Sequence, residues 1–92
     1  MSASGGGNAW FVYILQCADG TLYTGITTDM TRRLAEHNGE GMLGARYTRR
    51  RRPVVLAYLE PAGSRAEAAR REAAIKRLDR ARKLALCGSV TI

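Results

Sequence analysis

The first candidate for chemistry is a cation on the apolar face of a predicted short helix. Met30, Arg33, Leu34 and His37 stand at positions i, i+3, i+4 and i+7, the spacing of one stripe of an amphipathic helix. Arg33 therefore points inward, either with its head group reaching back to water or as a cation directed into a cleft. His37, on the same stripe, fits either a hydrogen-bonded core histidine or a general base.

A second charged residue lies at the edge of an apolar stripe further along the chain. Ala68, Glu72, Ile75 and Leu78 are separated by four, three and three residues, so they share one face of a helix. A carboxylate in that place costs free energy unless a cation, hydrogen bonds or a metal ion compensates it. Two interpretations are open, namely an ion pair with Lys76 at i+4 and a single-carboxylate ligand of Mg²⁺.

The charge of the chain favours an anionic partner. The 92 residues include 15 Lys and Arg against 8 Asp and Glu, a net charge of +7, and 13 of those cations are arginines. Arginine binds phosphate in a bidentate way, so we expect nucleic acid as the partner. The longest apolar run, residues 9–15, is too short to cross or anchor in a bilayer, and no membrane association is expected. Two cysteines without a C-x-x-C motif indicate no zinc site and a reducing cytoplasm.

The segments around these residues predict the elements that must position them. Strands are expected at residues 10–17, 21–26 and 54–60, and helices at 30–37, about 65–78 and 80–86. Asp-Gly between the first two strands indicates a hairpin, and Ser64-x-x-Glu67 is a capping box. This order predicts an α+β fold, a small three-stranded, mainly antiparallel sheet flanked by helices. Residues 1–8 are expected to be a flexible leader, and residues 9–92 a single domain.

Four short motifs in this frame resemble a known family. Val12-Tyr13-Ile14, Tyr23-Thr24-Gly25, Arg33 within an Arg-Arg-Leu sequence and the later Glu72 resemble the GIY-YIG endonuclease superfamily. The likeness is greatest to its small stand-alone bacterial members, and extends to the N-terminal nuclease domain of excinuclease C. It covers nearly all of residues 10–86. The eponymous motifs read Val-Tyr-Ile and Tyr-Thr-Gly here, with both tyrosines and the second-motif glycine kept.

The resemblance implies a phosphodiesterase that uses one divalent metal ion, Mg²⁺ or Mn²⁺. One of Tyr13 and Tyr23 would position or deprotonate the attacking water, and the other would hydrogen-bond around the scissile phosphate. Arg33 would stabilise the charge that develops on the phosphoryl group. Glu72 would bind the metal, and His37 is a secondary catalytic candidate. The expected function is a DNA endonuclease selective for structured or single-stranded substrates, in DNA repair or recombination.

A basic segment is expected to hold the nucleic acid near this site. It contributes Arg46, Tyr47, Arg49, Arg50, Arg51 and Arg52, and Lys76 of the second long helix adds to them. DNA is expected rather than RNA, and selectivity would come from nucleic-acid shape or from a partner protein. Two alternatives to an enzyme are a non-catalytic nucleic-acid-binding module and an adaptor that docks on a repair or translation partner.

The spacing of the two tyrosines adds a condition on the hairpin. With a two-residue loop at Asp19-Gly20, Tyr13 and Tyr23 would lie on opposite faces of the sheet, because side chains alternate along a strand. A shared site requires one face. We therefore predict a three-residue loop or a bulge at Gly20, which shifts the register by one residue.

Overall fold

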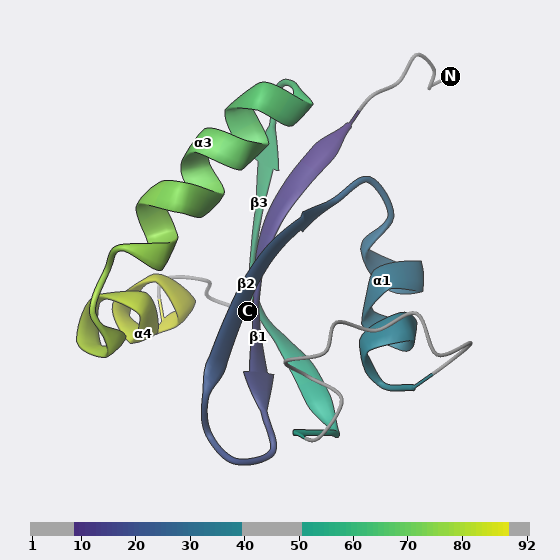
Figure 1. The fold of residues 1–92 in the computed structure, drawn as a ribbon, viewed down its shortest axis with the longest axis vertical. Helices are drawn as coiled ribbons and strands as arrows, with labels where there is room; N and C mark the ends of the chain where they lie inside the picture. Colours follow the sequence, from purple (N-terminus) through teal and green to yellow (C-terminus); the bar gives the residue numbers. More distant parts are fainter. Residues whose placement is uncertain (1–8, 40–50, 89–92) are drawn as a thin grey trace.

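The computed structural model describes residues 9–39 and 51–88, which form the predicted α+β fold. Its elements are β1 (Trp10–Cys17), β2 (Leu22–Thr27), α1 (Met30–His37), β3 (Val54–Ala62), α3 (Arg65–Lys76) and α4 (Arg80–Gly88). The three strands are antiparallel in the order β2-β1-β3. In Figure 1, α3 and α4 lie on one side of the sheet and α1 on the other.

Three predicted boundaries differ from the structure. β3 extends to Ala62, so Pro61 belongs to the strand and not to the turn after it. A proline is tolerated there because β3 is an edge strand. The α3 helix ends at Lys76 and leaves Leu78 beyond it, with the backbone N–H of Leu78 donating to the Ile75 carbonyl at 3.0 Å. The predicted docking of residues 90–92 on the sheet falls outside the described residues.

The hairpin between β1 and β2 has the predicted three-residue loop. Gln16 pairs with Leu22, the Cys17 N–H donates to the Thr21 carbonyl at 2.9 Å, and Gly20 has a positive φ of 87°. Tyr23 then lies opposite Leu15, and Gly25 lies opposite Tyr13. The prediction that both tyrosines share one face of the sheet is therefore confirmed.

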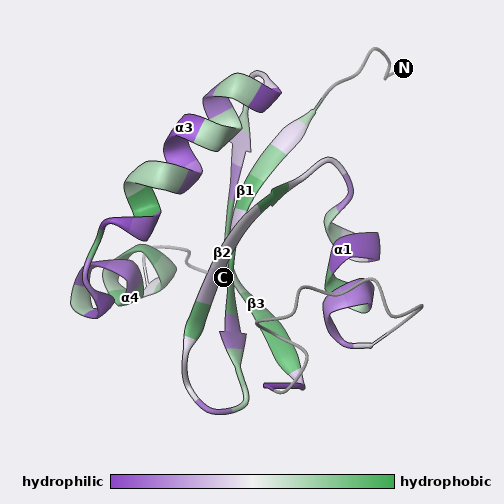
Figure 2. Ribbon diagram, in the orientation of Figure 1, coloured by the Kyte–Doolittle hydropathy of each residue, from purple (hydrophilic) through white to green (hydrophobic). Residues whose placement is uncertain are grey.

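The two faces of the sheet pack against different helices. Val12 and Ile14 of β1 meet Ala68 and Ile75 of α3, and all four side chains are fully buried. The alternate residues of β1 face α1, where Tyr13 and Leu15 pack beside partly buried Met30 and Leu34. Figure 2 shows that α1 is hydrophilic over much of its length, so the second face combines an apolar floor with polar groups above it.

None of the helices in residues 9–39 and 51–88 is long and apolar enough to cross a membrane.

Candidate active site

A triangle of three rings lies between the sheet and α1. The ring centroids of Tyr13 and Tyr23 are 6.4 Å apart, and those of Tyr23 and His37 are 5.1 Å apart. Tyr13 and His37 close the triangle at 5.9 Å. These residues come from β1, β2 and α1, so the three elements that follow one another in the chain converge on one point.

Gly25 makes room for the Tyr13 ring. A Cβ atom added to Gly25 would lie 2.6 Å from Tyr13 Cζ, and closer still to the hydroxyl oxygen. No side chain larger than hydrogen fits between them without movement. The sequence suggests a close approach of backbone at this glycine, and the structure identifies the approaching group as the neighbouring strand's tyrosine. The glycine thus fixes the direction of the Tyr13 phenol across β2.

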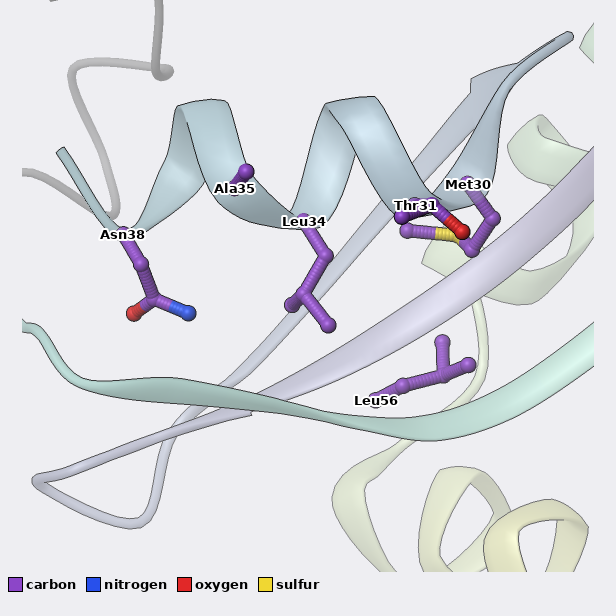
Figure 3. Close-up of a pocket in the computed structure, with 6 residues that line it drawn as sticks. All are labelled: Met30, Thr31, Leu34, Ala35, Asn38 and Leu56. Carbon is purple, nitrogen blue, oxygen red and sulfur yellow. The ribbon is translucent and has the colours of Figure 1, made fainter. Parts of the chain in front are cut away.

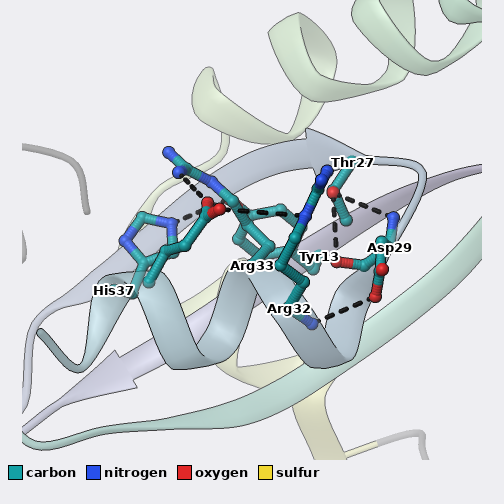
Figure 4. Close-up of polar contacts among 7 residues, drawn as sticks. Tyr13, Thr27, Asp29, Arg32, Arg33 and His37 are labelled. Atoms are coloured by element: carbon teal, nitrogen blue, oxygen red, sulfur yellow. Dashed lines mark hydrogen bonds and ion pairs between the residues drawn. The ribbon is translucent and has the colours of Figure 1, made fainter. Parts of the chain in front are cut away.

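The Tyr13 hydroxyl makes a buried hydrogen bond to His37. The distance between Tyr13 Oη and His37 Nε2 is 3.0 Å, and both side chains are almost completely buried (Figure 4). Arg33 donates a second hydrogen bond to the phenol, since a guanidinium has no acceptor. The Tyr13 hydrogen is then directed to His37 Nε2, which places the proton of neutral His37 on Nδ1.

Burial keeps both partners of this hydrogen bond uncharged near neutral pH. Burial raises the pKa of Tyr13 to about 12, against the opposing effect of the Arg33 hydrogen bond. Burial also lowers the pKa of His37 to about 4, and the positive charge of Arg33 adds to the lowering. His37 is therefore able to accept a proton at pH 7, and Tyr13 holds its own proton until another group takes it.

Arg33 lies where the helical stripe predicts, between the phenol and solvent. Its Nη1 is 2.8 Å from Glu36 Oε1, and 26% of its side chain is exposed. Arg32 forms a longer pair with the same carboxylate, at 3.7 Å, and is 66% exposed, as expected for a surface cation. Of the two neighbouring arginines, only Arg33 combines contact with Tyr13 and access for a ligand.

Glu72 occupies the edge of the α3 stripe, half-buried, beside the fully buried Ala68 and Ile75. Its Oε2 is 3.3 Å from Lys76 Nζ, so the predicted i,i+4 pair is present. The core of α3 packs on the other face of the sheet, yet the charge of Glu72 contributes to the raised pKa of Tyr13. The carboxylate is thus within electrostatic reach of the phenol.

The donor set at Glu72 fits a metal ion shared with a substrate. No group of three His, Cys, Asp or Glu side chains in the described segments is arranged to hold a metal. Mg²⁺ commonly uses only one or two carboxylates and completes its coordination with water and substrate phosphate. The Lys76 side chain is 55% exposed, and an exposed helical pair of this kind is weak enough to rearrange. Glu72 can therefore supply one oxygen ligand.

Residues that the sequence analysis did not assign hold α1 in place. The Asp29 carboxylate caps the helix by accepting from the Arg32 N–H at 3.0 Å. At the other end, the Asn38 amide pairs with the backbone of Val54, donating to its carbonyl at 3.0 Å and accepting from its N–H at 2.7 Å. Asparagine before glycine indicates only a helix stop in the sequence, because the partner lies 16 residues away.

The predicted nucleic-acid contacts are only partly within the described residues. Arg46, Tyr47, Arg49 and Arg50 lie outside them. Arg51 pairs with Asp19 at 3.0 Å, and Arg52 donates from Nε to the His37 carbonyl at 2.7 Å. Arg52 is therefore a cap on the C-terminal end of α1 next to the site, a favourable place for a cation because of the helix dipole.

An apolar groove of about 450 Å³ lies between α1 and β3, away from this chemistry. Figure 3 shows its lining, which consists of Met30, Thr31, Leu34, Ala35, Asn38 and Leu56. None of these six side chains is titratable, and none belongs to the ring triangle. We therefore place the candidate active site at the triangle.

Comparisons with known proteins match nearly the whole described chain. A family model described as the GIY-YIG catalytic domain matches residues 9–85. A UPF0213 protein of Desulfotalea psychrophila is 63% identical over 78 residues, which are 85% of this chain and 70% of that protein. The solution NMR structure of a UPF0213 protein from Bacillus halodurans is similar with a TM-score of 0.57 and 41% identity, over 90% of this chain and 86% of that one. A solution NMR structure from E. faecalis has a TM-score of 0.58 and 44% identity, over 84% and 80% of the two chains.

Proposed function

Because this chain belongs to the GIY-YIG family, we propose that it is a divalent-metal-dependent DNA endonuclease that hydrolyses a phosphodiester bond. The observation that carries the proposal is the buried hydrogen bond between Tyr13 and His37, with the Arg33 guanidinium on the same phenol. This arrangement joins a proton acceptor, a hydroxyl and a cation at one point. Such a combination suits the attack of water on a phosphate.

Tyr13 and His37 would form the path for the proton of the attacking water. The phenol oxygen takes a proton from the water while its own proton passes to His37 Nε2, 3.0 Å away. This coupled transfer avoids a free phenolate, which the raised pKa of Tyr13 disfavours. His37 is uncharged at pH 7 and accepts the proton as the water oxygen bonds to phosphorus. The proton returns to solvent after the leaving 3′ oxygen has departed.

The charged residues would act on the phosphate itself. Arg33 stabilises the extra negative charge on the phosphoryl oxygens, a role for which loss of one donor typically slows catalysis by about 10²–10³-fold. Tyr23, next to His37, hydrogen-bonds around the scissile phosphate. Glu72 and Lys76 lie at the α3 side, where Glu72 binds the Mg²⁺ or Mn²⁺ ion. That ion, when bound, polarises the phosphate and assists the leaving oxygen.

The substrate would be chosen by shape and not by base sequence. Contacts from arginine to phosphate carry little sequence information, and the chain adds no recognition domain within residues 9–39 and 51–88. Single-stranded or branched DNA of the kind that arises in repair and recombination fits this mode of selection, with a partner protein as a further source of specificity.

Replacement of the proposed metal ligand tests this function. Wild type and Glu72→Gln are incubated with labelled single-stranded, duplex and forked DNA and with RNA, in Mg²⁺, Mn²⁺ or EDTA. Cleavage by wild type that needs the metal and is lost in Glu72→Gln is the expected result. Glu67→Gln is the matched control, because Glu67 lies on the same helix but accepts from the Gly63 N–H at its first turn.

The same experiment separates an enzyme from a binding module. A binding module would retain DNA without metal-dependent cleavage of any substrate, and Glu72→Gln would then change nothing. Equal loss of cleavage in Glu67→Gln and Glu72→Gln would also count against the proposal, because it would reflect damage to α3 and not loss of a ligand.

A further inference from the structure

A cluster of cations at the start of α4 has no ion-pair partner in the described structure. Arg77, Arg80, Arg82 and Lys83 fall within seven residues, and Asp79 is the one acidic residue among them. None of the ion pairs found in residues 9–39 and 51–88 involves these four cations. Asp79 accepts from the Arg82 backbone N–H at 2.9 Å, as the N-cap of α4.

Cations elsewhere in the fold are used differently. Arg33, Arg51 and Arg71 each lie 2.8 to 3.0 Å from a carboxylate oxygen. The positive charge at the start of α4 therefore stays uncompensated by the protein, although an N-cap region favours anionic groups and disfavours cations. Such a cluster is stabilised when an external polyanion binds it.

One side of α4 directs this charge toward the β1–β2 turn. Arg80, Lys83 and Cys87 stand at i, i+3 and i+7, and Cys87 packs against the core. Arg80 Nη2 lies 4.0 Å from the point where a side chain on Gly20 would begin. Arg82 is about 160° around the helix from Arg80, so its side chain leaves on the other side.

The same turn carries a second arginine from a distant part of the chain. Arg51 pairs with Asp19 at 3.0 Å, and its carbonyl accepts from the Ala18 N–H at 2.9 Å. The Asp19 carboxylate is thus neutralised by Arg51 and by two hydrogen bonds from Thr21. Arg80 then adds net positive charge at the turn, which lies at the lower end of the sheet in Figure 1.

The turn lies close to the candidate active site along β2. Gly20 precedes Tyr23 by three residues, about 10 Å of extended chain. Successive phosphates of one strand of duplex DNA advance by about 3.4 Å along the helix axis, so 10 Å corresponds to about three nucleotides. A nucleic acid whose scissile phosphate lies at the ring triangle can therefore reach the turn within a few nucleotides.

We propose that Arg80 and Lys83, with Arg51 across the β1–β2 turn, bind the backbone of the substrate strand about three nucleotides from the scissile phosphate. This inference rests on the proposed nuclease function for the position of the cut. The site recognises the phosphate backbone of a nucleic acid and contributes affinity and strand position without reading bases.

Binding in EDTA tests the site without cleavage. The affinity of a labelled single-stranded DNA for the full chain is measured by fluorescence anisotropy over a range of salt concentrations. Arg80→Ala/Lys83→Ala should bind more weakly, and the slope of log K against log salt should fall by about 2, one for each lost contact. Arg70→Ala/Arg82→Ala is the matched control, because it removes the same charge from exposed positions on α3 and α4.

Two outcomes overturn the inference. One is a wild-type slope and affinity in Arg80→Ala/Lys83→Ala, and the other is an equal loss in the control, which would reflect net charge alone. Circular dichroism checks that both variants are folded, and Arg80→Glu, a single exposed change, should weaken binding more than Arg82→Glu. Cleavage by wild type together with an unchanged slope would refute this site and leave the nuclease standing. A selective loss of slope without cleavage by wild type would support the binding surface and refute the nuclease.

Discussion

The two faces of the sheet start from the same strand and differ in what they bury. Toward α3, β1 presents Val12 and Ile14, which pack against Ala68 and Ile75. Toward α1, the alternate positions present Tyr13, whose hydroxyl bonds to His37, and Leu15. The first face buries apolar side chains alone, whereas the second buries two titratable groups in contact. The period of two along one strand therefore separates stability from chemistry.

The polar face remains stable because its buried groups satisfy one another. In the described residues every buried side-chain nitrogen and oxygen has a hydrogen-bond partner. An unsatisfied buried polar group would cost about 1–3 kcal/mol. The α3 face needs no such matching, so substitutions there should change stability, and substitutions on the α1 face should change activity or its pH dependence.

The largest effect on stability is expected on the apolar face. Ile75 is fully buried in the α3 core, and Ile75→Ala should lower the free energy of unfolding by about 2–5 kcal/mol because it leaves a cavity. Cleavage per folded molecule should stay near the wild-type value. Urea denaturation followed by tryptophan fluorescence gives the first quantity, and a cleavage assay at low temperature gives the second. A loss of cleavage in fully folded protein would show that the two faces are not separable.

The pH dependence of stability distinguishes the polar face. The folded state binds a proton at His37 only near pH 4, while the unfolded chain does so near the ordinary pKa of 6.5. Stability should therefore fall as the pH drops from 6.5 to 4, by up to about 3 kcal/mol from this residue. For Tyr13 the folded pKa of about 12 exceeds the ordinary 10.0, so stability should fall as the pH rises from 10 to 12.

Denaturation of wild type, His37→Gln and Tyr13→Phe at several pH values measures these two contributions. His37→Gln should flatten the acid side of the profile, and Tyr13→Phe the alkaline side. Identical acid profiles for wild type and His37→Gln would mean that the buried imidazole is not the group that titrates.

A smaller effect is expected where the polar face meets the edge strand. Gly25→Ala should cost about 1–3 kcal/mol of stability, because the new methyl group overlaps the Tyr13 ring. Cleavage should fall as well, since the ring can no longer hold its hydroxyl against His37. A double-mutant cycle with Tyr13→Ala checks the cause. The penalty of Gly25→Ala should shrink when the ring is absent, and an unchanged penalty would point to the backbone of β2 instead.

Local patterns in the sequence were sufficient for most of the fold. The apolar run of β1, the Asp19-Gly20 turn and the caps at Asp29 and Ser64 predict their elements because each signal acts within a few residues. The end of β3 was predicted wrongly, since Pro61 reads as a turn unless the strand is known to lie at an edge. The helical stripe also predicted the inward position of Arg33, and the alternation of β1 and β2 predicted the loop that brings two tyrosines together.

The sequence by itself determined which residues share a face of a strand or helix, because those periods are properties of the local backbone. Only the tertiary structure decided which faces meet. The bond between Tyr13 and His37 spans 24 residues, and the Asn38 clamp on Val54 spans 16. Contacts of this kind depend on how the elements pack, and so does the burial that lowers the pKa of His37 and raises that of Tyr13.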